Sequence, residues 1–194
     1  MDVEDSLDAS EIKSIQFLIE VLDYSSEKDY KKLEEFIQNK MAMFKKNNHP
    51  YKLYFKAMLL RCTNESNYHE YEENYYGLLS KSAKRGCKEA QYIIANQCYE
   101  KKQYQEAIEL YKESSFNGYA PAQWCYGIDL FNGIKDVLEK DEEKGLLYIE
   151  FSAGQSYEYA LEFLINRYRT IKEKKEEDMI RLDMYINMLK LTEQ

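Results

Sequence analysis

A short sequence motif is repeated in this chain at a fixed spacing, and this repeat limits the folds that the chain can adopt. The segment GCKEAQY at 86–92 returns 32 residues later as GYAPAQW at 118–124, and a weaker third copy is aligned on Ala160, 38 residues after Ala122. Small residues stand four and eight positions before each aligned alanine: Gly86, Gly118 and Ser156, and then Ser82, Ser114 and Ser152. Such repetition predicts stacked helix pairs, because one pair cannot bury its apolar face alone.

Apolar residues at helical spacing continue through most of the 194 residues. The two prolines and seven glycines are too few for a turn-rich β protein. The pattern predicts an all-α chain of about five antiparallel helix pairs, with helices near 12–22, 27–46, 51–62, 68–85, 90–100, 104–116, 122–131, 141–153, 157–170 and 174–191. No linker separates them, so we expect one helical-repeat domain over 1–194, divided into divergent helices (1–65), repeats (68–170) and a C-terminal capping helix (174–191).

The third copy is six residues late because of the segment GIKDVLEKD, which lies between the two expected helices of one pair. An insertion at that place lengthens a loop and leaves the stack undisturbed. Close helix contacts are expected where side chains are short, at Ala90, Ala95, Ala107, Ala122 and Gly127. The last helix carries Met179, Leu182, Ile186 and Leu189 on one side. We expect that side to cover the open end of the stack, although Met179, Met184 and Met188 could instead form an adaptable binding surface.

The repeated residues resemble a Sel-one-like repeat, a relative of the tetratricopeptide repeat. The resemblance covers roughly residues 68 to 170 and rests on AQWCYG at 122–127, Gly133, EKG at 143–145 and Tyr148, together with the similar series at 104–118. The chain departs from the family pattern at Ala95, Lys101 and Ile165, where glycines are usual. The resemblance implies a right-handed α-solenoid that binds protein partners as an adaptor, scaffold or inhibitor and is not an enzyme.

In such stacks the first helix of each pair lines the concave surface. Family register therefore implies these partner-binding residues: Tyr92, Asn96, Tyr99, Trp124, Ile128, Phe131, Tyr159, Glu162 and Asn166. Two aromatic tiers are expected, Tyr92 with Trp124 and Tyr99 with Phe131, and the single tryptophan is the leading candidate. Rigid aromatics with a polar rim are typical of protein-binding hot spots. The alternative is that these rings only pack between adjacent repeats.

The net charge and the absence of known motifs disfavour several other classes of function. The net charge is −8 with no basic stripe, which disfavours nucleic acid. No apolar run could span a membrane, and the acidic start of the chain does not resemble a signal peptide, so we expect a cytoplasmic protein. Cysteine pairs at ligand spacing and nucleotide or hydrolase motifs are absent, so we expect no catalytic residue, metal or cofactor. We expect free thiols, with Cys98 and Cys125 in the core and Cys87 more exposed.

The sequence therefore favours a non-enzymatic protein-interaction module that binds a partner protein through its concave face. It leaves two forms open, an adaptor that recruits a peptide or domain and a cytosolic immunity protein that neutralises a cognate bacterial toxin. The acidic composition fits the second form if the toxin is basic. An enzyme with a cryptic site is a third and disfavoured alternative.

Overall fold

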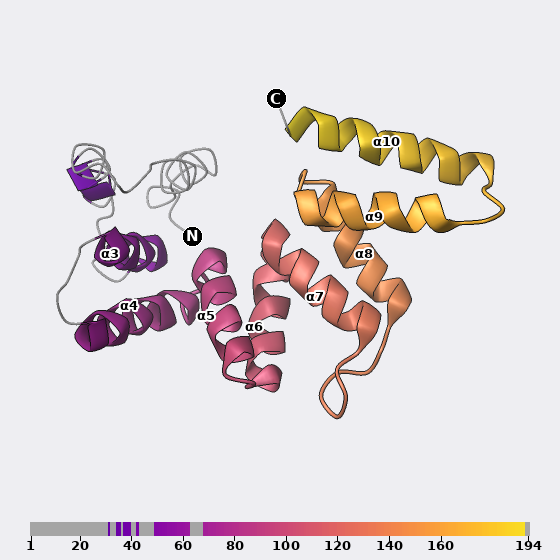
Figure 1. Ribbon diagram of the computed structural model, residues 1–194. Helices are drawn as coiled ribbons and strands as arrows, with labels where there is room; N and C mark the ends of the chain where they lie inside the picture. The colour runs from indigo at the N-terminus through magenta and orange to yellow at the C-terminus, as the bar shows by residue number, and fades with distance from the viewer. Residues whose placement is uncertain are drawn as a thin grey trace. The chain divides into compact units, whose positions relative to one another are not determined.

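The computed structural model describes residues 49–62 and 68–192, together with 31, 34, 35, 37–39 and 42, and it does not describe the side chains of 61–71. Within these residues all regular structure is helical except one isolated bridge (Figure 1). The helices are α3 (Pro50–Cys62), α4 (Tyr68–Ala83), α5 (Lys88–Glu100), α6 (Tyr104–Phe116), α7 (Ala120–Asn132), α8 (Glu142–Ala153), α9 (Glu158–Thr170) and α10 (Glu176–Thr192). They confirm the all-α prediction and lie within a few residues of the predicted bounds. The predicted helix at 12–22 and most of that at 27–46 lie outside the described residues.

The chain divides into two compact units, residues 1–90 and 91–194, with the boundary inside α5. Each unit is described by itself, and the single domain over 1–194 stays a prediction. In the first unit, α3 packs on α4 around the fully buried side chains of Phe55 and Leu79. The Ser82 hydroxyl on α4 donates a hydrogen bond of 2.7 Å to the carbonyl oxygen of Pro50, in the first turn of α3.

In the second unit, α6 packs on α7, α7 on α8, α8 on α9 and α9 on α10. Helix α5 is joined to α6 by a 2.6 Å hydrogen bond from the Tyr111 hydroxyl to the Asn96 side-chain oxygen. The core between α8, α9 and α10 contains Ile149, Leu161, Leu164 and Tyr185, all buried. Helices therefore follow one another as antiparallel pairs, each buried by its neighbours in the chain.

The repeated small residues have a clear structural role at the ends of α4, α6 and α8. The amides of Cys87, Tyr119 and Tyr157 bond to the carbonyls of Ser82, Ser114 and Ser152, and a second bond closes each turn inside the first. This pair of bonds is the Schellman motif, which needs a left-handed residue just after the helix. That residue is Gly86 (φ 90°), Gly118 (φ 77°) or Ser156 (φ 63°), so the third copy keeps the turn without the glycine.

The close helix contacts predicted from small residues are also present, since Ala90, Ala95, Ala107, Ala122 and Gly127 are all buried. Helices α7 and α8 approach most closely at two glycines. A methyl group added to Gly145 would lie 2.6 Å from the Phe131 amide nitrogen and 2.7 Å from the Gly127 carbonyl oxygen. The inserted segment forms the loop between these helices, closed by a bridge between Ile134 and Leu138.

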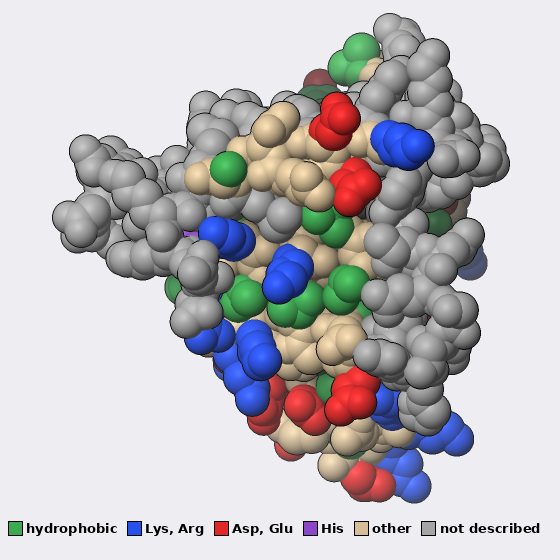
Figure 2. All heavy atoms as spheres, turned by 90° about the vertical axis from the view of Figure 1, so that its left-hand side faces the viewer, with side chains coloured by type: hydrophobic (Ala, Val, Ile, Leu, Met, Phe, Trp, Pro, Cys, Tyr) green, Lys and Arg blue, Asp and Glu red, His purple; other side chains and the backbone are tan. Residues whose placement is uncertain are grey.

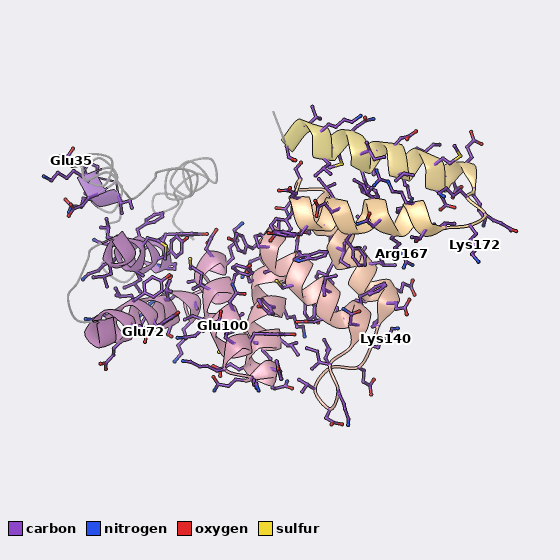
Figure 3. All side chains as sticks on the ribbon, viewed as in Figure 1. Glu35, Glu72, Glu100, Lys140, Arg167 and Lys172 are labelled. Carbon is purple, nitrogen blue, oxygen red and sulfur yellow. The ribbon has the colours of Figure 1, made fainter. Side chains whose placement is uncertain are left out.

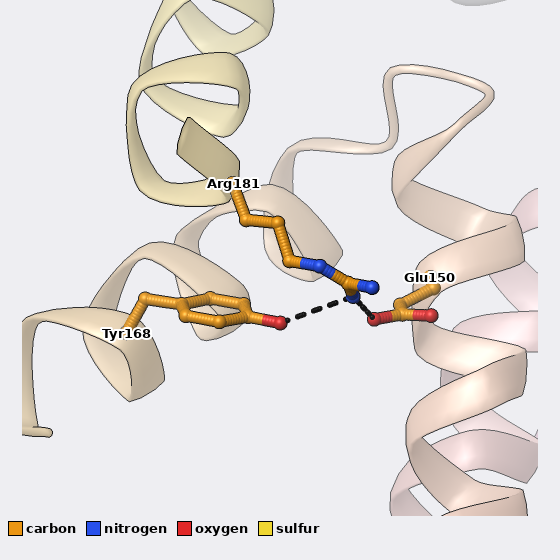
Figure 4. A network of polar contacts seen from close by, with 3 residues as sticks. All are labelled: Glu150, Tyr168 and Arg181. Carbon is orange, nitrogen blue, oxygen red and sulfur yellow. Dashed lines mark hydrogen bonds and ion pairs between the residues drawn. The ribbon is translucent and has the colours of Figure 1, made fainter. Parts of the chain in front are cut away.

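Helix α10 packs on α9 and adds side chains to the core of the second unit, and its role as the cap of a repeat stack stays a prediction. Leu182, Ile186 and Leu189 pack against the core, but Met179 is more than half exposed, so its predicted place on the covered side is wrong. Met179 lies in the first turn of α10, and the start of α10 extends beyond the C-terminal end of α9 (Figure 1). The Arg181 guanidinium fastens the helix, binding the Glu150 carboxylate of α8 at 3.0 Å and the Tyr168 hydroxyl of α9 at 3.2 Å (Figure 4).

Candidate interaction face

All nine predicted partner-binding residues lie in the second unit, on alternate helices. Tyr92, Asn96 and Tyr99 come from α5, Trp124, Ile128 and Phe131 from α7, and Tyr159, Glu162 and Asn166 from α9. None of the nine is fully buried, and Tyr99 and Tyr159 are 37 % and 60 % exposed. We use the term aromatic face for the surface of Tyr92, Tyr99, Trp124, Phe131 and Tyr159. Whether it binds a partner stays a prediction.

The rings of the aromatic face meet in pairs different from the predicted tiers. Trp124 stacks on Tyr159, with ring centres 6.5 Å apart, and meets the edge of Phe163 at 5.7 Å. Phe131 also contacts Phe163, and the Arg167 guanidinium of α9 lies 5.5 Å from the Phe131 ring (Figure 3). These contacts hold α7 against α9 while leaving part of each ring open to solvent.

On α5 the tyrosines contact α6 and the turn that joins α6 to α7. Tyr92 meets Tyr111 and Tyr119, and Tyr99 meets Tyr104 and Tyr111. The rings therefore pack between helices, as the alternative interpretation required, but their exposed edges remain available to a partner. Packing and recognition are compatible here, because a ring fixed by its neighbours loses little entropy on binding.

A polar centre lies beneath Tyr99 and involves a residue that sequence reasoning missed. The Tyr99 hydroxyl donates to Oδ1 of Asp129 on α7 over 3.5 Å, and Asp129 is only 8 % exposed. Burial raises the pKa of this carboxyl to about 6. Burial and the nearby Asp129 also raise the pKa of the neighbouring Cys125 thiol, to about 12. The centre therefore holds an ionised carboxylate and a protonated thiol at neutral pH.

The first unit contains a second polar cluster, and it corrects one expectation. Cys87 is fully buried rather than more exposed, and the neighbouring Glu89 is 1 % exposed. The Cys87 thiol donates to Oε2 of Glu89 at 3.3 Å. Burial, reinforced by Glu89, raises the pKa of Cys87 well above its ordinary value, so the sulfur stays protonated and is no nucleophile.

Two predicted residues contribute to a different feature. Glu162 and Asn166 line a cleft of about 430 Å³ with Arg169, and Ile186, Leu189 and Lys190 of α10 form its other side. They therefore lie at the junction of α9 with α10, beside the aromatic face rather than within it. Exposed polar residues one turn apart could be assigned to a helix side from sequence, but the position of α10 could not.

Metal binding depends on four residue types in the described part of the chain, and thiol chemistry depends on its cysteines. No group of three or more His, Cys, Asp or Glu side chains there could hold a metal ion. The thiols of Cys87, Cys98 and Cys125 are free, while Cys62 and His69 have side chains outside the described set. None of the described helices is long and apolar enough to cross a bilayer.

Comparison with known proteins identifies the fold. A crystal structure of a Sel1 repeat protein from Oxalobacter formigenes matches this chain with a TM-score of 0.60 and 17 % sequence identity, covering 90 % of this chain and 78 % of that one. The chain has a Sel1-repeat fold. The Schellman turns, the buried alanines and the paired helices are the elements that build this fold here. No family model and no curated protein sequence matches the chain.

Proposed function

We propose that this chain is a non-enzymatic protein-binding module that recognises a partner protein through the aromatic face. The observation that carries the proposal is the Trp124–Tyr159 stack, which joins the first helices of two successive pairs and leaves Tyr159 60 % exposed. Large exposed aromatics that are already fixed by their neighbours are typical of binding hot spots. The Sel1-repeat fold supports the same class of function, because helical-repeat proteins commonly bind through an extended surface.

The rim of the aromatic face suits a partner that brings apolar side chains surrounded by charge. Arg167 and Glu162 are both exposed and lie on α9, the helix that carries Phe163. Neither sign of charge dominates there, so apolar contact supplies the affinity and the rim supplies orientation.

Composition favours a second candidate within this class, an immunity protein that inhibits a basic toxin. The net charge of −8 would speed the capture of a positively charged partner. On the side of the molecule shown in Figure 2, the lysine and arginine side chains of the described residues lie among their aspartates and glutamates, so the negative charge of these residues is not gathered into one patch there. We therefore place the adaptor first and the inhibitor second.

The test compares two exposed aromatic residues. Tyr159→Ala removes a ring of the aromatic face, and Phe151→Ala removes a ring that is 50 % exposed on α8, outside that face. Proteins captured from the native extract would be identified by mass spectrometry, and their affinity measured by calorimetry. We expect Tyr159→Ala to weaken binding by about tenfold or more and Phe151→Ala to leave it unchanged, with both variants melting within a few degrees of the parent.

Equal binding by the parent and Tyr159→Ala would overturn the proposal for this face. If the proposal holds, affinity separates its two forms. One basic partner held at sub-nanomolar Kd indicates an inhibitor, whereas several peptides held near micromolar Kd indicate an adaptor. Trp124→Ala is the weaker probe, because Trp124 also packs against the core and its loss would unfold the neighbouring helices.

A further inference from the structure

The carboxylate of Asp129 is buried, and one of its two oxygens has no hydrogen-bond donor among the described residues. Its Oδ1 accepts the Tyr99 hydroxyl at 3.5 Å, a distance at the weak limit for such a bond. Its Oδ2 is buried, and no donor reaches it within the described residues. Buried carboxylates are normally paired with a cation or several donors, because removing the charge from water is expensive.

The position of Asp129 in its helix adds to this cost. It lies in the last turn of α7, where helix carbonyls concentrate negative charge, and that turn contains no basic residue. The groups around it are neutral: Tyr99 from α5, Tyr111 from α6 and Cys125 from α7. No lysine, arginine or histidine in the described part of the chain forms an ion pair with it. An asparagine would keep the bond to Tyr99 without the charge, so packing alone does not explain an acid here.

Tyr99 is the only described side chain that donates to the carboxylate, and it is itself 37 % exposed at the end of α5. A side chain held by one long hydrogen bond can turn aside at little energetic cost. Movement of Tyr99 would open the carboxylate to the aromatic face. An arriving cation would then meet a carboxylate together with tyrosine rings, which attract positive charge through their faces. Arg167 over Phe131, at 5.5 Å, is an example of that contact on the neighbouring helix pair.

We propose that Asp129 binds a lysine or arginine side chain of the partner protein, which displaces the Tyr99 hydroxyl from the carboxylate. This inference rests on the proposed function and adds the chemistry of the anchoring residue. The basic side chain supplies the donor that Oδ2 lacks, and the exposed rings of the aromatic face bind the apolar residues on either side of it. Binding therefore converts an unfavourable buried charge into an ion pair that exists only in the complex.

The test uses capped tripeptides of sequence Gly-Lys-Gly and Gly-Arg-Gly, with norleucine and citrulline replacing the central residue as uncharged controls. Each would be titrated into the full chain and into Asp129→Asn, and amide NMR shifts in α5 and α7 recorded. We expect saturable shifts with the basic peptides alone, and binding about tenfold weaker or more in Asp129→Asn. Asp183→Asn is the matched control, because it removes an exposed negative charge on α10, outside the aromatic face, and should change affinity less than twofold.

Stability provides a second readout. With its uncompensated charge removed, free Asp129→Asn should melt about 2–5 °C above the parent. A lower melting temperature would mean that the carboxylate stabilises the free protein, and that would overturn the proposal. So would the absence of saturable shifts, or equal binding of the norleucine and citrulline peptides.

The two proposals fail in different ways. If Tyr159→Ala abolishes capture of the native partner while Asp129→Asn binds it normally, the aromatic face is correct and the cation site is wrong. If the basic peptides bind at Asp129 but Tyr159→Ala captures the native partner unchanged, the cation site stands apart from the aromatic face.

Discussion

The helix pairs α3–α4 and α7–α8 contain the same kind of serine–carbonyl hydrogen bond, but they differ in how closely the two helix backbones approach each other. In each pair a serine of the second helix donates to a carbonyl in the first turn of the first helix, 32 residues earlier: Ser82 to Pro50 at 2.7 Å and Ser152 to Ala120 at 2.8 Å. The second pair adds a backbone crossing at Gly127 and Gly145, whereas Gly77 of α4 faces open space. The polar contact therefore persists where the close-crossing glycines are absent.

The largest effect is expected at the glycine crossing. Gly145→Ala would place a methyl group against backbone atoms of Phe131 and Gly127, which cannot move without separating α7 from α8. We expect the free energy of unfolding of the second unit to fall by about 2 kcal/mol, the clash exceeding the helix propensity that alanine adds. Urea unfolding followed by the fluorescence of Trp124, the single tryptophan, would measure it. A variant as stable as the parent would show that the crossing can relax.

An intermediate effect is expected at the shared contact. Ser82→Ala and Ser152→Ala each lose one buried hydrogen bond, so each should destabilise its own unit by roughly 1 kcal/mol. Hydrogen exchange of the α3–α4 amides reports the first variant, and Trp124 fluorescence reports the second. Destabilisation by Ser152→Ala alone would mean that the two contacts are alike in geometry but not in energy.

The smallest effect, with the opposite sign, is expected at Gly77. Gly77→Ala adds a methyl group within α4 where no neighbouring atom of the described residues lies within 4 Å. The lower conformational freedom of alanine in the unfolded chain should stabilise the first unit by roughly 0.5–1 kcal/mol. Hydrogen exchange in α4 would detect the gain. A loss of stability would reveal that α4 needs its glycine and would remove the contrast with Gly145.

The sequence predicts the features that depend on neighbours along the chain. The spacing of Gly86, Gly118 and Ser156 marks three helix ends, because each Schellman turn is made within six residues. The aligned alanines identify the buried side of each first helix, because helical periodicity alone decides which residues share a side. These local rules located the described helices and most of their bounds.

Features that depend on the distance between helices could not be predicted in the same way. Cys87 follows a left-handed glycine, and the Schellman turn folds it back onto α4, where it is buried. The burial of Asp129 depends on how closely α5, α6 and α7 meet. The aligned positions of the neighbouring repeats hold Gln97 and Arg167. A polar residue at this position therefore did not indicate that Asp129 would be buried. The only sequence signal was an acid in a final helical turn without a base.

The loop between α7 and α8 has a practical consequence. It carries the six additional residues of the longest repeat and closes on itself through Ile134 and Leu138, with the exposed Asp136 at its tip. A fluorophore or an affinity tag inserted at Asp136 would touch neither the serine–carbonyl contact nor the glycine crossing. The chain thus contains a natural attachment point, through which it can be immobilised or labelled while every helix pair keeps its packing.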